Sequence, residues 1–185
     1  MIDLSKTIDL PDSITVLGKS YRIHTDYQFF ITFVLMAKKP HTYEEYNFMY
    51  EGKIPADVVK GFEELKNFAF PKKELPRDIG NDTDEIILDY EKDGDLIYSA
   101  FWQCYGIDLK AEDLNLHWYK FLALLSGIKD TKLNKVMEFR SYIPKEEDGK
   151  EYRKYMLQMR EMWRIEKELT DEEKEAIFNF DSQLK

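Results

Sequence analysis

The chain has few of the residue types from which catalytic and metal sites are built. Its single cysteine, Cys104, excludes an internal disulfide bond and a cysteine-based zinc cluster. Its three histidines, His24, His41 and His117, belong to no spacing pattern that a metal site needs. The chain also lacks a Gly-x-Ser-x-Gly turn, a P-loop and a Gly-x-Gly-x-x-Gly loop. We therefore expect no catalytic residue, no metal and no cofactor, and a protein that is not an enzyme.

Two weaker candidates for chemistry are better explained as structure. Cys104 falls on the apolar stripe of an expected helix, near its C-terminus, where burial and the helix dipole both disfavour a reactive thiolate. Asp89, Asp93 and Asp95 look like the start of a calcium-binding loop, but no Glu follows at the spacing that such a loop requires. We interpret these aspartates as the solvated face of a helix.

The chain has no excess of positive charge and no long apolar run. Its net charge is −9, and basic residues are interleaved with acidic ones, as in residues 150–154. Nucleic acids and anionic membranes are bound through positive charge, so we expect neither as a partner. The most apolar run, residues 29–37, is far shorter than the roughly 20 residues of a membrane-spanning helix. The first residues do not resemble a signal peptide, and we expect a cytoplasmic protein.

The material for a hydrophobic core is present. The 185 residues are 43% hydrophobic and 15% aromatic, with 12 Phe, 12 Tyr and 3 Trp. Disordered chains lack such a share of aromatic residues. A folded chain of this size buries roughly 70% of the surface that its unfolded form exposes, and so needs no disulfide or metal for stability.

The chain begins with a hairpin pattern, followed by helical patterns. Residues 13–17 and 20–24 are rich in β-branched and aromatic side chains and flank Gly18-Lys19, which predicts a β-hairpin turn. Asp26 is a suitable N-cap for a largely buried helix over 27–38. A lone hairpin is marginal in water, so we expect it to pack on helices.

Apolar periodicity and capping residues predict several further helices. Thr42 and Glu45 form a capping box, Pro55 suits a first helical turn, and Asp113 and Thr131 are suitable N-caps. The expected helices cover residues 43–50, 55–67, 82 or 84 to 105, 114–127, 131–143, 150–168 and 170 onward. The sequence thus predicts a mainly α protein, a compact helical domain of about six to eight helices with a short N-terminal β-hairpin. We divide it into a helical domain with the hairpin (1–145) and charged C-terminal helices, packed on it or projecting as an arm (146–185).

The expected helix over 150–168 carries a stripe of tyrosine, methionine and tryptophan. Methionine adapts its shape to partners, and tyrosine and tryptophan are enriched at the energetic centres of protein interfaces. Packing of this stripe on the protein's own core is the alternative interpretation. If the stripe binds a partner, the contact residues are Tyr152, Tyr155, Met159 and Trp163.

An ordered set of motifs in the second half of the chain is similar to a known family. Residues 99–109 read Ser-Ala-Phe-Trp-Gln-Cys-Tyr-Gly-Ile-Asp-Leu, followed by Leu-His-Trp-Tyr-Lys-Phe at 116–121 and Leu-Leu-Ser-Gly at 124–127. Thr-Lys-Leu at 131–133 and Val-Met-Glu-Phe-Arg at 136–140 complete the set. This order resembles a family of tail-morphogenesis proteins of long-tailed bacteriophages that infect low-GC Gram-positive bacteria. Their genes lie between those for the major tail protein and the tape-measure protein.

The resemblance implies a tail assembly chaperone in the cytoplasm of the bacterial host. Such a protein coats the aggregation-prone tape-measure protein, helps to recruit major tail protein subunits, and leaves before the tail is complete. The resemblance also implies self-association, and it carries no catalytic residues. Gly106 and Gly127 of the motif are expected to end helices with a positive φ.

Three other functions stay open on the sequence alone. The first is a structural tail or head–tail connector component that is retained in the virion. The second is an acidic inhibitor that imitates DNA, although lysines interrupt nearly every acidic run. The third is an enzyme whose site would appear as a pocket holding a histidine or carboxylate with a shifted pKa.

Overall fold

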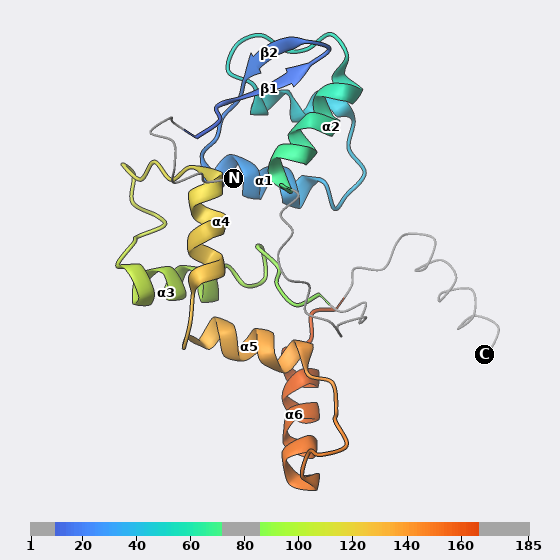
Figure 1. Cartoon of the computed structure of the whole chain (residues 1–185), viewed down its shortest axis with the longest axis vertical. Helices are drawn as coiled ribbons and strands as arrows, with labels where there is room; N and C mark the ends of the chain where they lie inside the picture. The colour runs from blue at the N-terminus through green and yellow to red at the C-terminus, as the bar shows by residue number, and fades with distance from the viewer. Residues whose placement is uncertain (1–9, 72–85, 167–185) are drawn as a thin grey trace, which may run out of the picture. The chain divides into compact units, whose positions relative to one another are not determined.

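The computed structural model describes residues 10–71 and 86–166, and these fall into two compact units (Figure 1). Unit 1 comprises Met1–Gly80 and Tyr90–Asn134, and unit 2 comprises Asn81–Asp89 and Lys135–Lys185. The described residues form seven helices, one of them a 3-10 helix, and one β-hairpin. The predicted mainly α fold with an N-terminal hairpin is therefore confirmed. The division at residue 145 stays a prediction, and the helix expected from residue 170 lies outside the described residues.

The hairpin of unit 1 forms as the sequence predicts, with a turn one residue earlier. Strands β1 (Ser13–Val16) and β2 (Lys19–Arg22) are antiparallel, with Ile14 opposite Tyr21. The turn residues are Leu17 and Gly18, with φ values of 50° and 77°, in place of the expected Gly18-Lys19. A tight hairpin turn that follows the strand twist needs positive φ at both central residues, and glycine occupies the second position without strain.

The next helices begin at side-chain caps. Helix α1 (Tyr27–Met36) is capped by Asp26, whose carboxylate accepts a hydrogen bond from the Gln28 N–H at 2.9 Å. The 3-10 helix η1 (Tyr43–Met49) has the predicted capping box. Helix α2 (Val58–Ala69) begins at its cap Asp57, later than the predicted start at Pro55, because the Asp57 carboxylate accepts from the Lys60 N–H.

Two predicted helix starts are wrong. Helix α3 (Gly94–Tyr105) begins about ten residues later than expected, and Asp89 and Asp93 before it are buried rather than on a solvated helix face. Cys104 on α3 is exposed, not part of the buried stripe. Helix α4 (Trp118–Gly127) begins after His117 instead of Asp113, because the His117 ring accepts a hydrogen bond from the Tyr119 N–H at 3.0 Å.

The two motif glycines have different roles. Gly106 follows α3 with a φ of 64°, as predicted. Gly127 is the last residue of α4 and has no positive φ, so that expectation is wrong. A Cβ at Gly127 would lie 2.9 Å from the Tyr105 hydroxyl, which donates to the Leu124 carbonyl at 2.8 Å. Close approach of a tyrosine thus explains this glycine.

The core of unit 1 is built on stacked aromatic rings from α1 and α4. Trp118, the first residue of α4, is 1% exposed. Its ring stacks on Phe30 and Phe121 at centroid distances of 5.4 and 5.5 Å. Its indole N–H donates to the Ala69 carbonyl at 2.9 Å, which ties the end of α2 to this core. Buried aromatic pairs of this kind add roughly 0.5–1.5 kcal/mol each beyond the area they bury.

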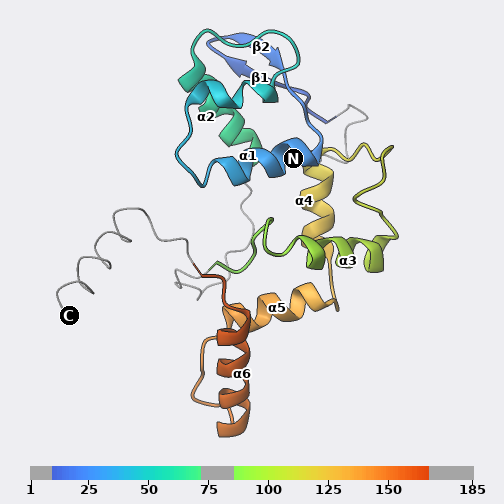
Figure 2. The same cartoon turned by 180° about the vertical axis from the view of Figure 1, so that it is seen from behind.

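Contacts between elements place the hairpin and α3 at opposite ends of unit 1. The hairpin strand β1 packs on α2, α2 on η1, η1 on α1, α1 on α4, and α4 on α3. Figures 1 and 2 show the same separation from both sides. The hairpin therefore packs on a helix, as expected for an isolated hairpin.

Gly61 on α2 packs closely against other residues, which gives a testable prediction. A Cβ added at Gly61 would lie 2.6 Å from the Tyr50 hydroxyl oxygen and 2.8 Å from the Pro55 ring. Tyr50 is itself buried, and this burial raises the pKa of its hydroxyl to about 12. We expect Gly61→Ala to lower the free energy of unfolding by about 1–3 kcal/mol through overpacking. Chemical denaturation measures this.

Gly94→Ala is the matched control for that variant. Gly94 is the first residue of α3, and no atom lies within 4 Å of an added Cβ. Alanine is the better helix former, so no loss of stability is expected. Equal losses in the two variants would contradict the close-packing explanation.

Unit 2 is described over residues 86–89 and 135–166. Helix α5 (Lys132–Ser141) begins in unit 1 and continues in unit 2, and Thr131 caps it as predicted through a 3.4 Å hydrogen bond from the Asn134 N–H. Helix α6 (Lys150–Trp163) follows after a loop. No helix among the described residues is both long and apolar enough to cross a membrane.

Candidate protein-binding surface on α6

Asp148 holds the loop that leads into α6. Its carboxylate accepts hydrogen bonds from the Lys145 N–H at 2.8 Å and from the Tyr142 hydroxyl at 2.7 Å. The backbone hydrogen bond from Lys145 is the main reason that the pKa of Asp148 is lowered. Arg153, in the first turn of α6, donates to the Lys145 carbonyl at 2.7 Å. The loop that leads into the helix is thereby held by several polar contacts.

Arg140 fixes the other end of α6. The side chain extends from α5 and is 5% exposed. Its Nε donates to the Trp163 carbonyl at 2.7 Å, and its Nη1 donates to the Ile87 carbonyl at 3.0 Å. A cation at the last carbonyls of a helix also interacts favourably with the helix dipole. One buried guanidinium thus joins α5, the end of α6 and the segment 86–89.

The four predicted contact residues divide into exposed and partly covered side chains. Tyr152 and Tyr155 are 48% and 47% exposed. Tyr152 makes an edge contact with the Tyr142 ring at 6.0 Å, and Tyr155 makes one with the Phe139 ring at 6.1 Å. Met159 and Trp163 are only partly exposed. Met156, on the same helix, is 1% exposed and packs inside unit 2, as the alternative interpretation of the stripe expects.

Beside this packed face, one edge of α6 is exposed at three residues and partly exposed at Met159. Met162 is 69% exposed, and sequence reasoning missed it. Residues 152, 155, 159 and 162 follow one another at helical spacing and so share one side of the helix. This spacing could have identified Met162 from the sequence. We call these four residues, Tyr152, Tyr155, Met159 and Met162, the α6 edge.

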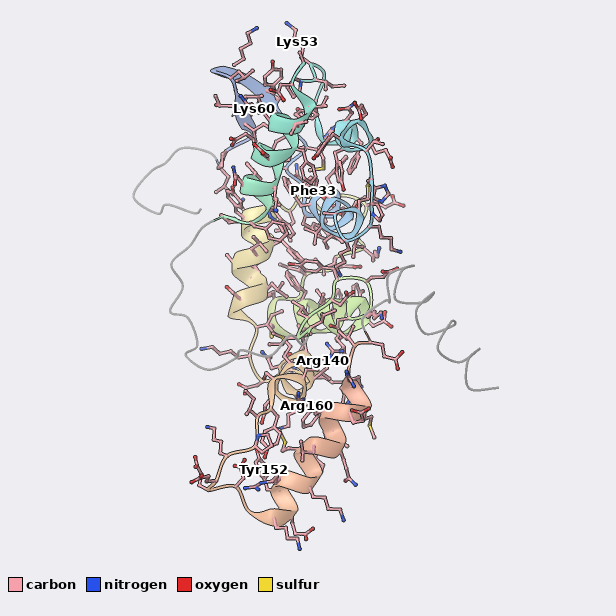
Figure 3. All side chains as sticks on the ribbon, turned by 90° about the vertical axis from the view of Figure 1, so that its right-hand side faces the viewer. Phe33, Lys53, Lys60, Arg140, Tyr152 and Arg160 are labelled. Carbon is pink, nitrogen blue, oxygen red and sulfur yellow. The ribbon has the colours of Figure 1, made fainter. Side chains whose placement is uncertain are left out.

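The helix that carries this edge is locally basic. Four basic and two acidic residues lie between Lys150 and Trp163, in a chain of net charge −9. Figure 3 shows Tyr152 and Arg160 beside α6 and Arg140 beside α5. Leu157, which is 41% exposed, lies on a different side of α6 from the edge. The arrangement is a firmly held helix with exposed aromatic and methionine side chains, suited to packing against an apolar partner face.

Candidate metal ligands do not gather at one place in the described part of the chain. Within residues 10–71 and 86–166, no group of three or more His, Cys, Asp or Glu side chains is placed to hold a metal ion. His24 stacks on Phe29 at 4.2 Å and lies 3.5 Å from a Glu51 oxygen. His41 Nδ1 lies 2.7 Å from a Glu45 oxygen. The three histidines thus have separate structural contacts.

We expect His117 to make the stability of the fold depend on pH. Its Nδ1 accepts from the Tyr119 N–H, and its Nε2 lies 3.0 Å from the Pro11 carbonyl, an arrangement that needs the neutral ring. Burial is the main cause that lowers its pKa. The unfolded chain therefore binds a proton at higher pH than the folded one. We expect the free energy of unfolding to decrease as pH falls below about 6.5.

Denaturant titrations between about pH 7 and 5 measure this effect, with His117→Asn as the control because asparagine can cap the helix without titrating. The carboxylates of Glu45 and Asp148, whose pKa values are lowered mainly by backbone hydrogen bonds, stabilise the fold above their ordinary pKa values. Their contribution is lost only at lower pH, below about 4. Equal pH dependence in wild type and variant would contradict the assignment to His117.

Comparison with known proteins identifies a family. The family model described as Bacteriophage Gp15 protein matches residues 57–165, more than half of the chain, and this range contains helices α2 to α6. No curated protein matches the chain, and no solved structure matches it.

Proposed function

Because the chain belongs to the Bacteriophage Gp15 protein family, we propose that it is a non-enzymatic tail assembly protein. In this proposal it acts as a chaperone in the host cytoplasm, binds the tape-measure protein and aids assembly of the tail tube, with the major tail protein as a further partner. The α6 edge is the binding surface. The observation that carries the proposal is this edge, which lies within the range matched by the family model.

The chemistry of the α6 edge supports a helical, apolar partner. A tape-measure protein is long and aggregation-prone, so the surface that covers it must accept apolar side chains along its length. Tyrosine and methionine suit this task because the first gives large, rigid contact area and the second adapts to irregular surfaces. An amphipathic helix of the partner can pack beside α6 with its apolar face against the edge.

The way in which α6 is held supports the same proposal. Asp148 holds the loop before the helix, and Arg140 binds a carbonyl at its end. A surface that is already ordered loses less conformational entropy when it binds. The net charge of −9 opposes non-specific association of the chaperone itself at high concentration.

The double variant Tyr155→Ala/Met162→Ala tests the surface directly. Both residues are exposed and lie on the α6 edge, so the loss of their side chains removes partner contact with little effect on folding. We expect the amount of tape-measure protein that co-purifies with the full-length chain to fall at least about tenfold. This is the size of effect expected when residues that contribute most of the binding energy are removed. Quantitative affinity purification after co-expression measures this.

Leu157→Ala is the matched control, because Leu157 is an exposed apolar residue on a different side of the same helix. It should leave co-purification unchanged. If Leu157→Ala weakens binding as much as the double variant, the α6 edge is not the specific surface. If the protein instead stays in purified virions in fixed copy number, a structural tail or connector role replaces the chaperone role.

A further inference from the structure

Helix α3, green in Figure 1, presents two large aromatic side chains to solvent. Trp102 is 56% exposed and Tyr98, one turn before it, is 37% exposed, whereas their neighbours Ile97 and Phe101 are buried. The Trp102 indole makes no hydrogen bond and no ring contact within the described part of the chain. Exposed tryptophan and tyrosine that share one side of a helix are typical of the centres of protein interfaces.

Carboxylates border the two rings. Asp95 lies one turn before Tyr98 on the same side of α3 and is exposed. Asp108, in the loop after the helix, accepts a hydrogen bond from the Tyr98 hydroxyl and another from the Lys110 N–H at 2.8 Å. These two contacts hold the Asp108 carboxylate beside the Tyr98 ring. We call Asp95, Tyr98, Trp102 and Asp108 the α3 face.

The charge around this face is also negative. Residues 90–113 contain six acidic and two basic residues. Neither Asp95 nor Asp108 forms an ion pair within the described part of the chain. Their charges therefore attract the cations of a partner and repel phosphate groups and acidic side chains. An apolar partner without cations would leave these carboxylates partly desolvated and unpaired, which costs binding energy.

We propose that the α3 face binds a basic amphipathic segment of another protein. Arginines of that segment stack on Trp102 and pair with Asp95 and Asp108, and its apolar side chains cover Tyr98. Arginine suits this face better than lysine because its planar guanidinium stacks on aromatic rings and pairs with a carboxylate through two parallel hydrogen bonds.

The geometry of α3 sets the spacing of the partner's cations. Asp95 and Trp102 are separated by about two helical turns, roughly 10 Å along the axis, and Tyr98 lies between them. A partner helix that packs beside α3 thus carries two arginines about two turns apart, with an apolar residue between them. This site goes beyond the proposed chaperone surface, because it lies in unit 1 and is acidic, whereas the α6 edge lies in unit 2 on a locally basic helix.

Fluorescence anisotropy of labelled peptides, titrated with the full-length chain, tests the proposal. The probe is an amphipathic peptide of about 18 residues, or five helical turns, with arginines two turns apart and leucines between them. In two matched peptides, lysines or glutamates replace the arginines. We expect the arginine peptide to bind, the lysine peptide to bind several-fold more weakly, and the glutamate peptide not to bind.

Variants of the chain place the peptide on the α3 face. Trp102→Ala and Asp95→Lys should each weaken binding of the arginine peptide at least about tenfold. Glu63→Lys is the matched control, because Glu63 is exposed on α2 and its replacement changes the net charge by the same amount as Asp95→Lys. It should bind the peptide nearly as tightly as wild type at physiological salt. Circular dichroism checks that each variant is folded.

Several outcomes would overturn the proposal. Equal losses in Asp95→Lys and Glu63→Lys would show that net charge alone attracts the peptide. Equal binding of the arginine and lysine peptides would remove the role of guanidinium stacking. No binding by wild type up to about 1 mM would exclude such a partner. A changed sedimentation coefficient of Trp102→Ala without peptide would mean that a second copy covers the face.

The α6-edge variant Tyr155→Ala/Met162→Ala separates this proposal from the chaperone role. It should bind the arginine peptide as wild type does, because its substitutions lie in unit 2. Loss of peptide binding in this variant would place the peptide on the α6 edge and contradict the α3 site. Co-purification of the tape-measure protein is measured without the peptide, so either proposal can fail alone.

Discussion

Replacing Trp118 by alanine is expected to lower the free energy of unfolding by about 3–5 kcal/mol, the range for a large aromatic residue removed from a core. The side chain is 1% exposed and stacks on Phe30 and Phe121. Its removal leaves a cavity among three helices that meet at this ring. It also leaves the buried carbonyl of Ala69 without its indole donor. Since domains of this size are stable by about 5–15 kcal/mol, this variant should unfold at markedly lower denaturant concentration.

Two variants separate the contributions at this site. Trp118→Phe keeps an aromatic ring in the stack but cannot donate to Ala69, and an unsatisfied buried carbonyl costs about 1–3 kcal/mol. Trp102→Ala removes the same side chain from an exposed position and should change stability by less than about 0.5 kcal/mol. Equal losses for Trp118→Ala and Trp102→Ala would contradict the placement of the core.

Arg140→Ala is expected to have the second large effect, and it should be confined to unit 2. The guanidinium donates to two backbone carbonyls, Trp163 and Ile87, from a buried position. Hydrogen bonds from a charged group contribute about 1.5–3 kcal/mol each, so a loss of about 3 kcal/mol or more is expected. Hydrogen exchange should become faster in residues 86–89 and toward the end of α6, while exchange in α1 and α4 stays slow.

The matched control for that variant is Arg164→Ala. Arg164 is exposed and lies 4.0 Å from the Glu161 carboxylate, and an exposed pair of this kind contributes about 0–1 kcal/mol. Arg140→Lys retains the charge but has no planar fork with which to reach two carbonyls, so its exchange rates should lie between those of wild type and alanine. Unchanged exchange near Trp163 in Arg140→Ala would contradict the role of this arginine in holding α6.

Local sequence signals predicted the elements whose ends depend on neighbouring residues. The Asp26 cap of α1, the Thr42–Glu45 capping box, the Thr131 cap of α5 and the positive φ of Gly106 each involve a side chain or backbone within a few residues. The hairpin was predicted from its β-branched strands and glycine turn, with an error of one residue.

Tertiary contacts decided the features that sequence could not supply. The helix expected from residue 82 or 84 begins only at Gly94, and Asp93 before it is almost completely buried, which no local pattern indicates. His117 replaces Asp113 as the N-cap of α4 because two contacts distant in sequence hold it. His117 forms a β-bridge with Asp26, and its ring contacts the Pro11 carbonyl. Gly127 depends on a tyrosine that lies 22 residues away in α3.

The candidate binding surface was only partly predictable for the same reason. Periodicity placed Tyr152, Tyr155, Met159 and Trp163 together on one stripe of α6. It could not show that the Tyr142 and Phe139 rings contact Tyr152 and Tyr155 of that stripe. Nor could it show that Arg140 binds the Trp163 carbonyl. Met162 joins the α6 edge because the packing of unit 2 leaves that side of the helix exposed.

Co-expression of the full-length chain with the tape-measure protein of the same phage genome tests the central claim most directly. The measurement is the amount of tape-measure protein in the soluble fraction, with and without the chain, followed by affinity purification. The proposed chaperone role predicts that the tape-measure protein is insoluble alone, becomes soluble in the presence of the chain, and co-purifies with it. A tape-measure protein that stays insoluble and forms no complex with the chain would contradict that role.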